Sequence, residues 1–205
     1  MTSRFILAAI IFTISAVTGV SAQDLRNREL IPDFRLTRTQ MPVEIVSIKL
    51  NGKEVEAGEK IIGNDDWLKG ASFSVRNISD KPIALITLIL RFEPTEGPIR
   101  VVGFGLSYGV DYSRGEPRSG SSPLPIQPDQ TVDLVLTEQR YPNFLEILSM
   151  GGIKLGFDKV PYYVERVCFE DDTNIIWEGG YLKRRDPASI GKFDIVEPYK
   201  LPARR

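Results

Sequence analysis

Few residues of this chain have side chains suited to nucleophilic catalysis, since it contains no histidine and a single cysteine, Cys168. Residues 105–109 read Gly-Leu-Ser-Tyr-Gly, the Gly-x-Ser-x-Gly pattern of a hydrolase nucleophile elbow. That elbow needs a strand-to-helix turn and a histidine that takes the serine proton. The chain has no such histidine and no helix is predicted directly after Gly109, so we interpret the match as coincidental.

A second serine pattern lies near the C-terminal end, where Ser189 and Lys192 have the Ser-x-x-Lys spacing that lets a lysine act as base. The pattern lacks its companion motifs and falls in a segment expected to be exposed, where a lysine stays protonated. Neither serine pattern therefore identifies a catalytic residue, and the sequence favours a protein that is not an enzyme.

Potential metal ligands are equally sparse. Zinc, iron and copper sites depend on histidine and cysteine. The acidic pairs Asp65-Asp66 and Asp171-Asp172 lack the spacing of an EF-hand loop, and acidic pairs in turns more often cap backbone groups. We therefore predict no metal site and no cofactor. Two carboxylates from distant strands would still suit a carboxylate-dependent hydrolase, which is the alternative function.

The best candidates for ligand binding lie in and beside a long loop, residues 111–130, which is rich in proline, glycine and serine. Loops of this length are usually functional or disordered. Rigid aromatic and charged side chains in flexible surroundings suit recognition. The candidate ligand-binding residues are Tyr108, Tyr112, Arg114 and Arg118. The alternative is a disordered surface loop without a binding role.

Three other conspicuous side chains are predicted to pack in the core. Trp67 follows a loop and Trp177 lies in an apolar run, and their alternative roles are sugar stacking or partner binding. Cys168 lies between Val167 and Phe169, where a buried thiol behaves as a small hydrophobic group. The alternative for this cysteine is an intermolecular disulfide.

Residues 1–22 have the pattern of an export signal peptide. Arg4 is their only charged residue, an apolar run covers residues 5–20, and residues 20–22 (Val-Ser-Ala) form a small-x-small cleavage site. We expect this segment to be removed from a secreted or periplasmic protein; an uncleaved membrane anchor is the alternative. No later segment is long and apolar enough to cross a bilayer. The net charge of −1 predicts no general attraction to nucleic acid or to a membrane surface.

The most informative pattern for the fold covers residues 73–92. Residues 83–92 are almost all apolar, and every second residue from Ala84 to Phe92 would line one apolar face, which is the period of a strand. With residues 73–78 they predict a β-hairpin across the polar residues 79–82. A hairpin cannot bury such a face alone, so a second sheet must cover it.

Turn and helix signals organise the rest of the chain. Asn51-Gly52 after an alternating strand predicts a type I′ hairpin turn, because both residues accept positive φ angles. One helix is predicted from Pro142, which is favoured at a first helical position, to Gly151 as its C-cap, across the open end of a sandwich. Further strands are predicted at residues 46–50, 53–62, 102–108, 132–136, 160–169 and 175–182.

These elements predict a single β-sandwich domain that covers residues 43–185. Residues 23–42 are charged and carry two prolines, so we expect a lead-in that packs late or not at all. Residues 186–205 are expected to form an extended tail after a short turn.

Two stretches carry a resemblance to known proteins. Residues 75–79 (Val-Arg-Asn-Ile-Ser) and residues 126–131 (Ile-Gln-Pro-Asp-Gln-Thr), each followed by an alternating apolar strand, resemble exported bacterial immunoglobulin-like modules. The resemblance implies an all-β, immunoglobulin-like antiparallel β-sandwich with one short helix and about seven to nine strands. Residues 169–187 are similar to the last hairpin of uncharacterised secreted bacterial proteins, which implies no activity.

The function expected from these observations is that of a secreted, non-enzymatic binding or structural module. It would act through loops or a sheet edge on a protein or glycan partner. One alternative is the carboxylate-dependent hydrolase. A second is a self-assembling subunit that uses its tails as an added strand. The oligomeric state is open.

Overall fold

The computed structural model of the protein describes residues 25–33, 40–94, 101–110, 123–170, 175–185 and 193–200. The signal peptide predicted at residues 1–22 lies outside these ranges, as do Ser189 and Lys192. The strands are β1 (Arg26–Pro32), β2 (Val43–Leu50), β3 (Lys53–Val55), β4 (Lys60–Gly63), β5 (Ser72–Asn77), β6 (Ile83–Phe92), β7 (Val102–Gly109), β8 (Thr131–Val135), β9 (Lys159–Phe169), β10 (Ile175–Glu178), β11 (Tyr181–Arg185) and β12 (Phe193–Pro198). The helix described is α1 (Tyr141–Met150).

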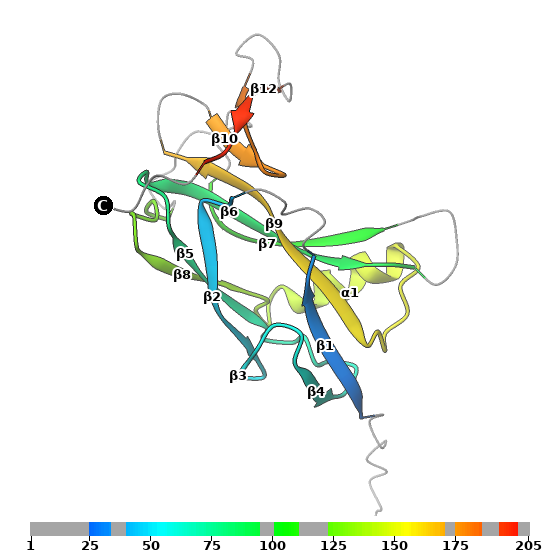
Figure 1. The fold of residues 1–205 in the computed structure, drawn as a ribbon. Coiled ribbons are helices and arrows are strands. Elements are labelled where there is room, and N and C mark those ends of the chain that lie inside the picture. Colours follow the sequence, from blue (N-terminus) through cyan, green and yellow to red (C-terminus); the bar gives the residue numbers. More distant parts are fainter. Residues whose placement is uncertain are drawn as a thin grey trace, which may run out of the picture.

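The strands form two sheets that pack face to face (Figure 1). The smaller sheet has the order β3-β2-β5-β8. In the larger, eight-stranded sheet, β9 pairs with β6 along one edge and with β1 and β10 along the other, while β7 pairs with β6. All pairs are antiparallel except β1 with β9. The all-β sandwich with one short helix is therefore confirmed, whereas the immunoglobulin-like topology stays a prediction.

The predicted hairpin of residues 73–92 is wrong in one respect. β5 pairs with β2 and β8 in the smaller sheet, and β6 pairs with β7 and β9 in the larger sheet, so the link between them crosses from one sheet to the other. Each strand turns an apolar face inward, and the two sheets cover one another as expected, with Ile86, Leu88 and Leu90 fully buried. The period of two fixed the face of each strand but not its partner.

Buried polar side chains hold this crossing link in place. The Asn77 side chain is fully buried, and its Nδ2 donates to the carbonyl oxygens of Lys81 at 2.8 Å and Ile126 at 3.0 Å. Its Oδ1 accepts from the backbone N–H and the hydroxyl of Ser79. One asparagine side chain thus forms hydrogen bonds with four polar groups of the link, which folding removes at least partly from water.

The Asn51-Gly52 turn is confirmed. Asn51 has a φ of 50° and Gly52 a φ of 75°, and Leu50 pairs with Lys53 across the turn. The strand predicted at residues 53–62 is instead split in two. β3 stays beside β2, and the chain then turns at residues 56–59 and joins the other sheet as β4, beside β1.

The helix has nearly the predicted bounds and packs at one end of the sandwich against β7 (Figure 1). Its Phe144 ring lies 5.0 Å from Phe104, and Leu148 is buried. Gly151 caps the helix with an ordinary φ of −80°, but a Cβ there would lie 2.3 Å from a methyl group of Val102. The reason for glycine at this position is therefore close packing against β7.

Two segments outside the predicted domain contribute strands. β1 lies between β4 and β9, so the expectation that residues 23–42 pack late or not at all is wrong for residues 26–32. β12 pairs with β11, so part of the expected tail belongs to the larger sheet.

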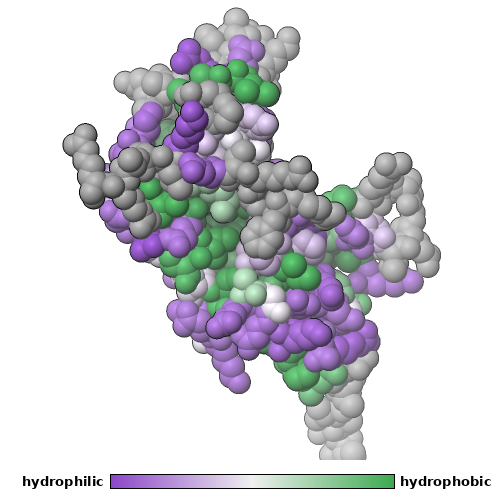
Figure 2. All heavy atoms as spheres, in the orientation of Figure 1, coloured by the Kyte–Doolittle hydropathy of each residue, from purple (hydrophilic) through white to green (hydrophobic). Residues whose placement is uncertain are grey.

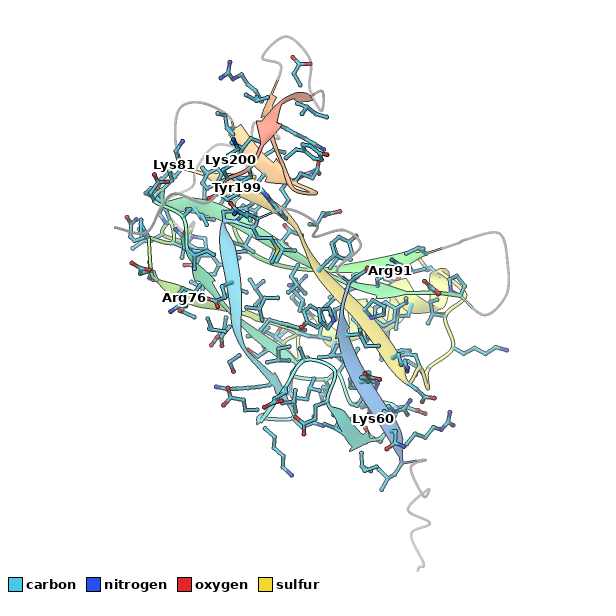
Figure 3. All side chains as sticks on the ribbon, viewed as in Figure 1. Lys60, Arg76, Lys81, Arg91, Tyr199 and Lys200 are labelled. Carbon is cyan, nitrogen blue, oxygen red and sulfur yellow. The ribbon has the colours of Figure 1, made fainter. Side chains whose placement is uncertain are left out.

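The C-terminal strands rise from one end of the sandwich and are anchored at their base (Figure 3). Tyr199 stacks on Phe169 with ring centroids 6.4 Å apart, and Lys81 Nζ lies 5.8 Å from the centre of the Phe169 ring.

Trp67 and Trp177 are fully buried and Cys168 is buried, which confirms core packing for all three. Within the described ranges, no helix has the length and apolar composition needed to cross a membrane.

Candidate functional site

A groove opens on one side of the sandwich, between the β2 and β3 strands of the smaller sheet and β9 of the larger one. We call it the lateral groove. Its volume is about 760 Å³, within the range of common ligand sites. The lining residues are Ile45, Val46, Ser47, Ile48, Glu54, Val55, Glu56, Ala57, Glu59 and Tyr162.

The turn at residues 56–59 creates the groove by ending β3 early. The Glu56 N–H donates to the Glu59 carboxylate at 2.8 Å, and the Glu59 N–H donates to the Glu56 carbonyl at 3.1 Å. Gly58 takes a φ of 80° and donates its N–H to the Leu30 carbonyl on β1 at 2.8 Å. Because this turn directs the chain to the other sheet, β3 covers only the end of β2, from Ile48 to Leu50.

The floor of the lateral groove is apolar and well supported. The Tyr162 ring packs 5.2 Å from Phe73, its side chain is almost fully buried, and burial raises the pKa of its hydroxyl to about 12. Val46, by contrast, is 43% exposed at a β-bulge between Ile45 and Ser47. In Figure 2, hydrophobic atoms gather in the middle of the molecule over β2, and hydrophilic atoms lie below them over β3.

The rim of the lateral groove is acidic. Glu54, Glu56 and Glu59 are exposed, and no lysine or arginine is among the lining residues. The Ser47 Oγ is buried and has no hydrogen-bond partner among the residues that the structure describes. The groove thus combines an apolar floor, a negative rim and one unsatisfied hydroxyl.

Of the ligand-binding residues predicted from the sequence, the structure describes only Tyr108. It lies near the end of β7, where its hydroxyl donates to the Leu124 carbonyl at 3.2 Å, and it does not line the lateral groove. Tyr112, Arg114 and Arg118 lie outside the described residues. The groove itself was missed, although the acidic spacing of Glu54, Glu56 and Glu59 next to the Asn-Gly turn was visible in the sequence.

The described residues that the sequence offered for catalysis or metal binding make contacts with neighbouring side chains. Ser107 lies inside β7, where its hydroxyl is 3.2 Å from that of Thr87, so residues 105–109 lack the geometry of a nucleophile elbow. Asp66 accepts a hydrogen bond from the Tyr141 hydroxyl at 2.9 Å. Burial and this bond raise the pKa of Tyr141 well above its ordinary value. Among the described residues, no group of three potential ligands could hold a metal ion.

A hydrolase based on two carboxylates would need one acid with a raised pKa. Burial alone would raise the pKa of Glu178, but hydrogen bonds from Lys183 and Arg166, and their charges, outweigh it and lower the pKa below its ordinary value. The Glu178 carboxylate accepts hydrogen bonds from Lys183 Nζ at 2.5 Å and from Arg166 Nη2 at 2.7 Å. This arrangement holds a carboxylate ionised, the opposite of a general acid.

No family model, curated protein or solved structure matches the chain. Its function is therefore inferred from the lateral groove and the residues that form it.

Proposed function

We propose that this protein is a secreted or periplasmic, non-enzymatic binding module that takes a segment of a protein partner in the lateral groove. The observation that carries the proposal is the groove itself, an apolar floor bounded by Glu54, Glu56 and Glu59. Apolar concave sites with a few polar groups at their edge are the usual form of a ligand site.

The composition of the floor supports a polypeptide over a glycan. Sugar rings stack on exposed aromatic faces, and the one aromatic lining residue, Tyr162, is almost fully buried against Phe73. Aliphatic residues such as Ile45 and Val55 offer pockets for apolar side chains instead.

The test is selection of a displayed random-peptide library against the purified protein, followed by affinity measurements on Val46→Asp. Val46 is 43% exposed in the groove, so aspartate there is expected to leave the fold intact and weaken binding at least about 10-fold by placing a charge against apolar ligand atoms. The matched control is Ile62→Asp on β4, at a residue 67% exposed and outside the groove, which is expected to leave affinity unchanged. Selected peptides that bind both variants alike would contradict the proposal.

A second candidate function, self-assembly, is favoured by the edge strand β12. Its Ile195 and Val196 are 64% and 44% exposed. Exposed apolar edge strands pair readily with other chains. If β12 is the interface, Ile195→Lys is expected to turn an oligomer into a monomer in light scattering over a range of protein concentrations; a mass unchanged by the substitution would remove this candidate.

A further inference from the structure

The edge of β2 next to the lateral groove is open. β2 has eight residues, and its pairing with β3 covers only Ile48–Leu50. Of the other five, Val43, Glu44, Ile45 and Ser47 pair with β5, Val46 forms the bulge, and no described strand lies against their other side. An unpaired strand edge offers backbone N–H and C=O groups to an incoming chain.

The direction of these backbone groups follows from the pairing of β2 with β5. The Pro42 carbonyl accepts the Ile78 N–H at 2.9 Å, so it points toward the β5 side. Successive residues of a strand point their backbone groups to alternate sides. Ile45 therefore points its N–H and C=O groups to the open side, where it lines the groove, whereas Val43 is only 1% exposed and is covered.

The position of β3 shows where a guest strand would lie. β3 already occupies the neighbouring place beside the end of β2, and it stops at Val55 because the turn at residues 56–59 leaves the sheet. A guest strand in line with β3 would extend the pairing along β2 beyond the point where β3 stops. Its inward side chains would meet Ile45, Val55 and Tyr162 on the floor.

The charges on the rim determine which charge is favoured on the outward side chains of a bound guest strand. Glu54, Glu56 and Glu59 give the lining residues three carboxylates and no cation. Cationic side chains on a guest would be attracted to this rim, and acidic ones would be repelled. Alternation of apolar and basic residues would therefore match both the floor and the rim.

We infer that the lateral groove binds an extended polypeptide of alternating apolar and basic residues by adding it as a strand to the open edge of β2. This inference rests on the proposed function and specifies its ligand and its mode. Backbone hydrogen bonds to Ile45, which lines the groove, would hold the guest, and the floor and rim would set its sequence preference.

The first experiment uses fluorescence anisotropy with labelled heptapeptides that alternate valine with arginine or valine with glutamate. The valine–arginine peptide is expected to bind at least about 10-fold more tightly and to weaken as salt is added. Glu54→Lys is expected to weaken it about 10-fold, whereas the matched Glu146→Lys on α1 leaves affinity unchanged. Equal binding of the two peptides, or binding of neither, would overturn the inference.

Backbone methylation tests the strand mode directly. In a strand, only alternate N–H groups face the neighbour. N-methylation of one alternate set in the valine–arginine peptide is expected to weaken binding about 10-fold or more, and methylation of the other set to have little effect. If both sets are tolerated while Val46→Asp still abolishes binding, strand addition is wrong and the proposed function stands. If binding also ignores Val46→Asp, both are wrong.

Discussion

Gly109→Ala is expected to lower the free energy of unfolding by about 3 kcal/mol or more, since it combines two costs. Gly109 has a φ of 99°, which is strained for any residue with a Cβ and costs about 1–2 kcal/mol. A Cβ there would also lie 1.8 Å from the Ala84 carbonyl oxygen and 2.8 Å from its carbon. Because this is backbone of the paired strand β6, relief requires moving the strand, at about 1–3 kcal/mol.

The measurement for Gly109→Ala is urea unfolding followed by circular dichroism, with the midpoint read at an unchanged slope. Gly105→Ala is the matched control on the same strand. A Cβ at Gly105 would meet Ile89 and Thr87 side chains at 3.6 and 3.7 Å, which is ordinary contact. We expect this control to change stability by less than about 1 kcal/mol. Equal midpoints for the two variants would show that the close approach of β7 to Ala84 does not make glycine necessary for stability at position 109.

Arg28→Met is expected to lower the free energy of unfolding by about 3 kcal/mol, because a fully buried guanidinium on β1 serves four acceptors. Its Nη1 donates to the Phe157 carbonyl at 2.8 Å and to Asp158 at 3.0 Å. Its Nη2 donates to Asp65 at 2.9 Å, and its Nε donates to the Gly63 carbonyl at 3.3 Å. Methionine keeps the apolar stem but leaves these acceptors without a donor.

The cost of Arg28→Met is expected to come from the carbonyl groups more than from the ion pairs. The side chains of Asp65 and Asp158 are 47% and 57% exposed, so water can replace the arginine there. Asp158→Asn is therefore the matched control, with an expected loss below about 1 kcal/mol. Thermal unfolding of both variants over a range of salt concentrations tests this. A loss from Arg28→Met that disappears in high salt would contradict the carbonyl account.

Arg28 also explains why β1 belongs to the sandwich although its sequence reads as a polar lead-in. Its contacts join β1 to the end of β4 and to the segment before β9, residues far apart in the sequence. A charged residue in a short strand predicts exposure unless its partners are known. Those partners come from residues 63–65 and 157–158, far from Arg28 in the sequence, so no local pattern could have revealed them.

The candidate site shows the same limit. The Asn51-Gly52 turn, predicted from two residues, places β3 beside β2 and brings Glu54 to the groove. The groove also needs β3 to stop at Val55, and it needs Tyr162 of β9 to lie beside it.

A different error concerns Gly179-Gly180, which has φ values of 58° and 93° and forms a hairpin turn that splits the strand predicted at residues 175–182. This pair is a known two-residue turn signal and could have been recognised.

The sequence by itself determined the features that depend on neighbours along the chain. These are the apolar face of β6, the turn at Asn51-Gly52, the helix near residues 142–151 and the burial of Trp67 and Trp177. Only the tertiary structure decided which strands pair, that β5 and β6 lie in different sheets, and that part of β2 has no described strand on its groove side, above an apolar floor. The physical reason is that side-chain period sets which face of a strand is buried, whereas backbone hydrogen bonds, identical for nearly every residue, set its partner.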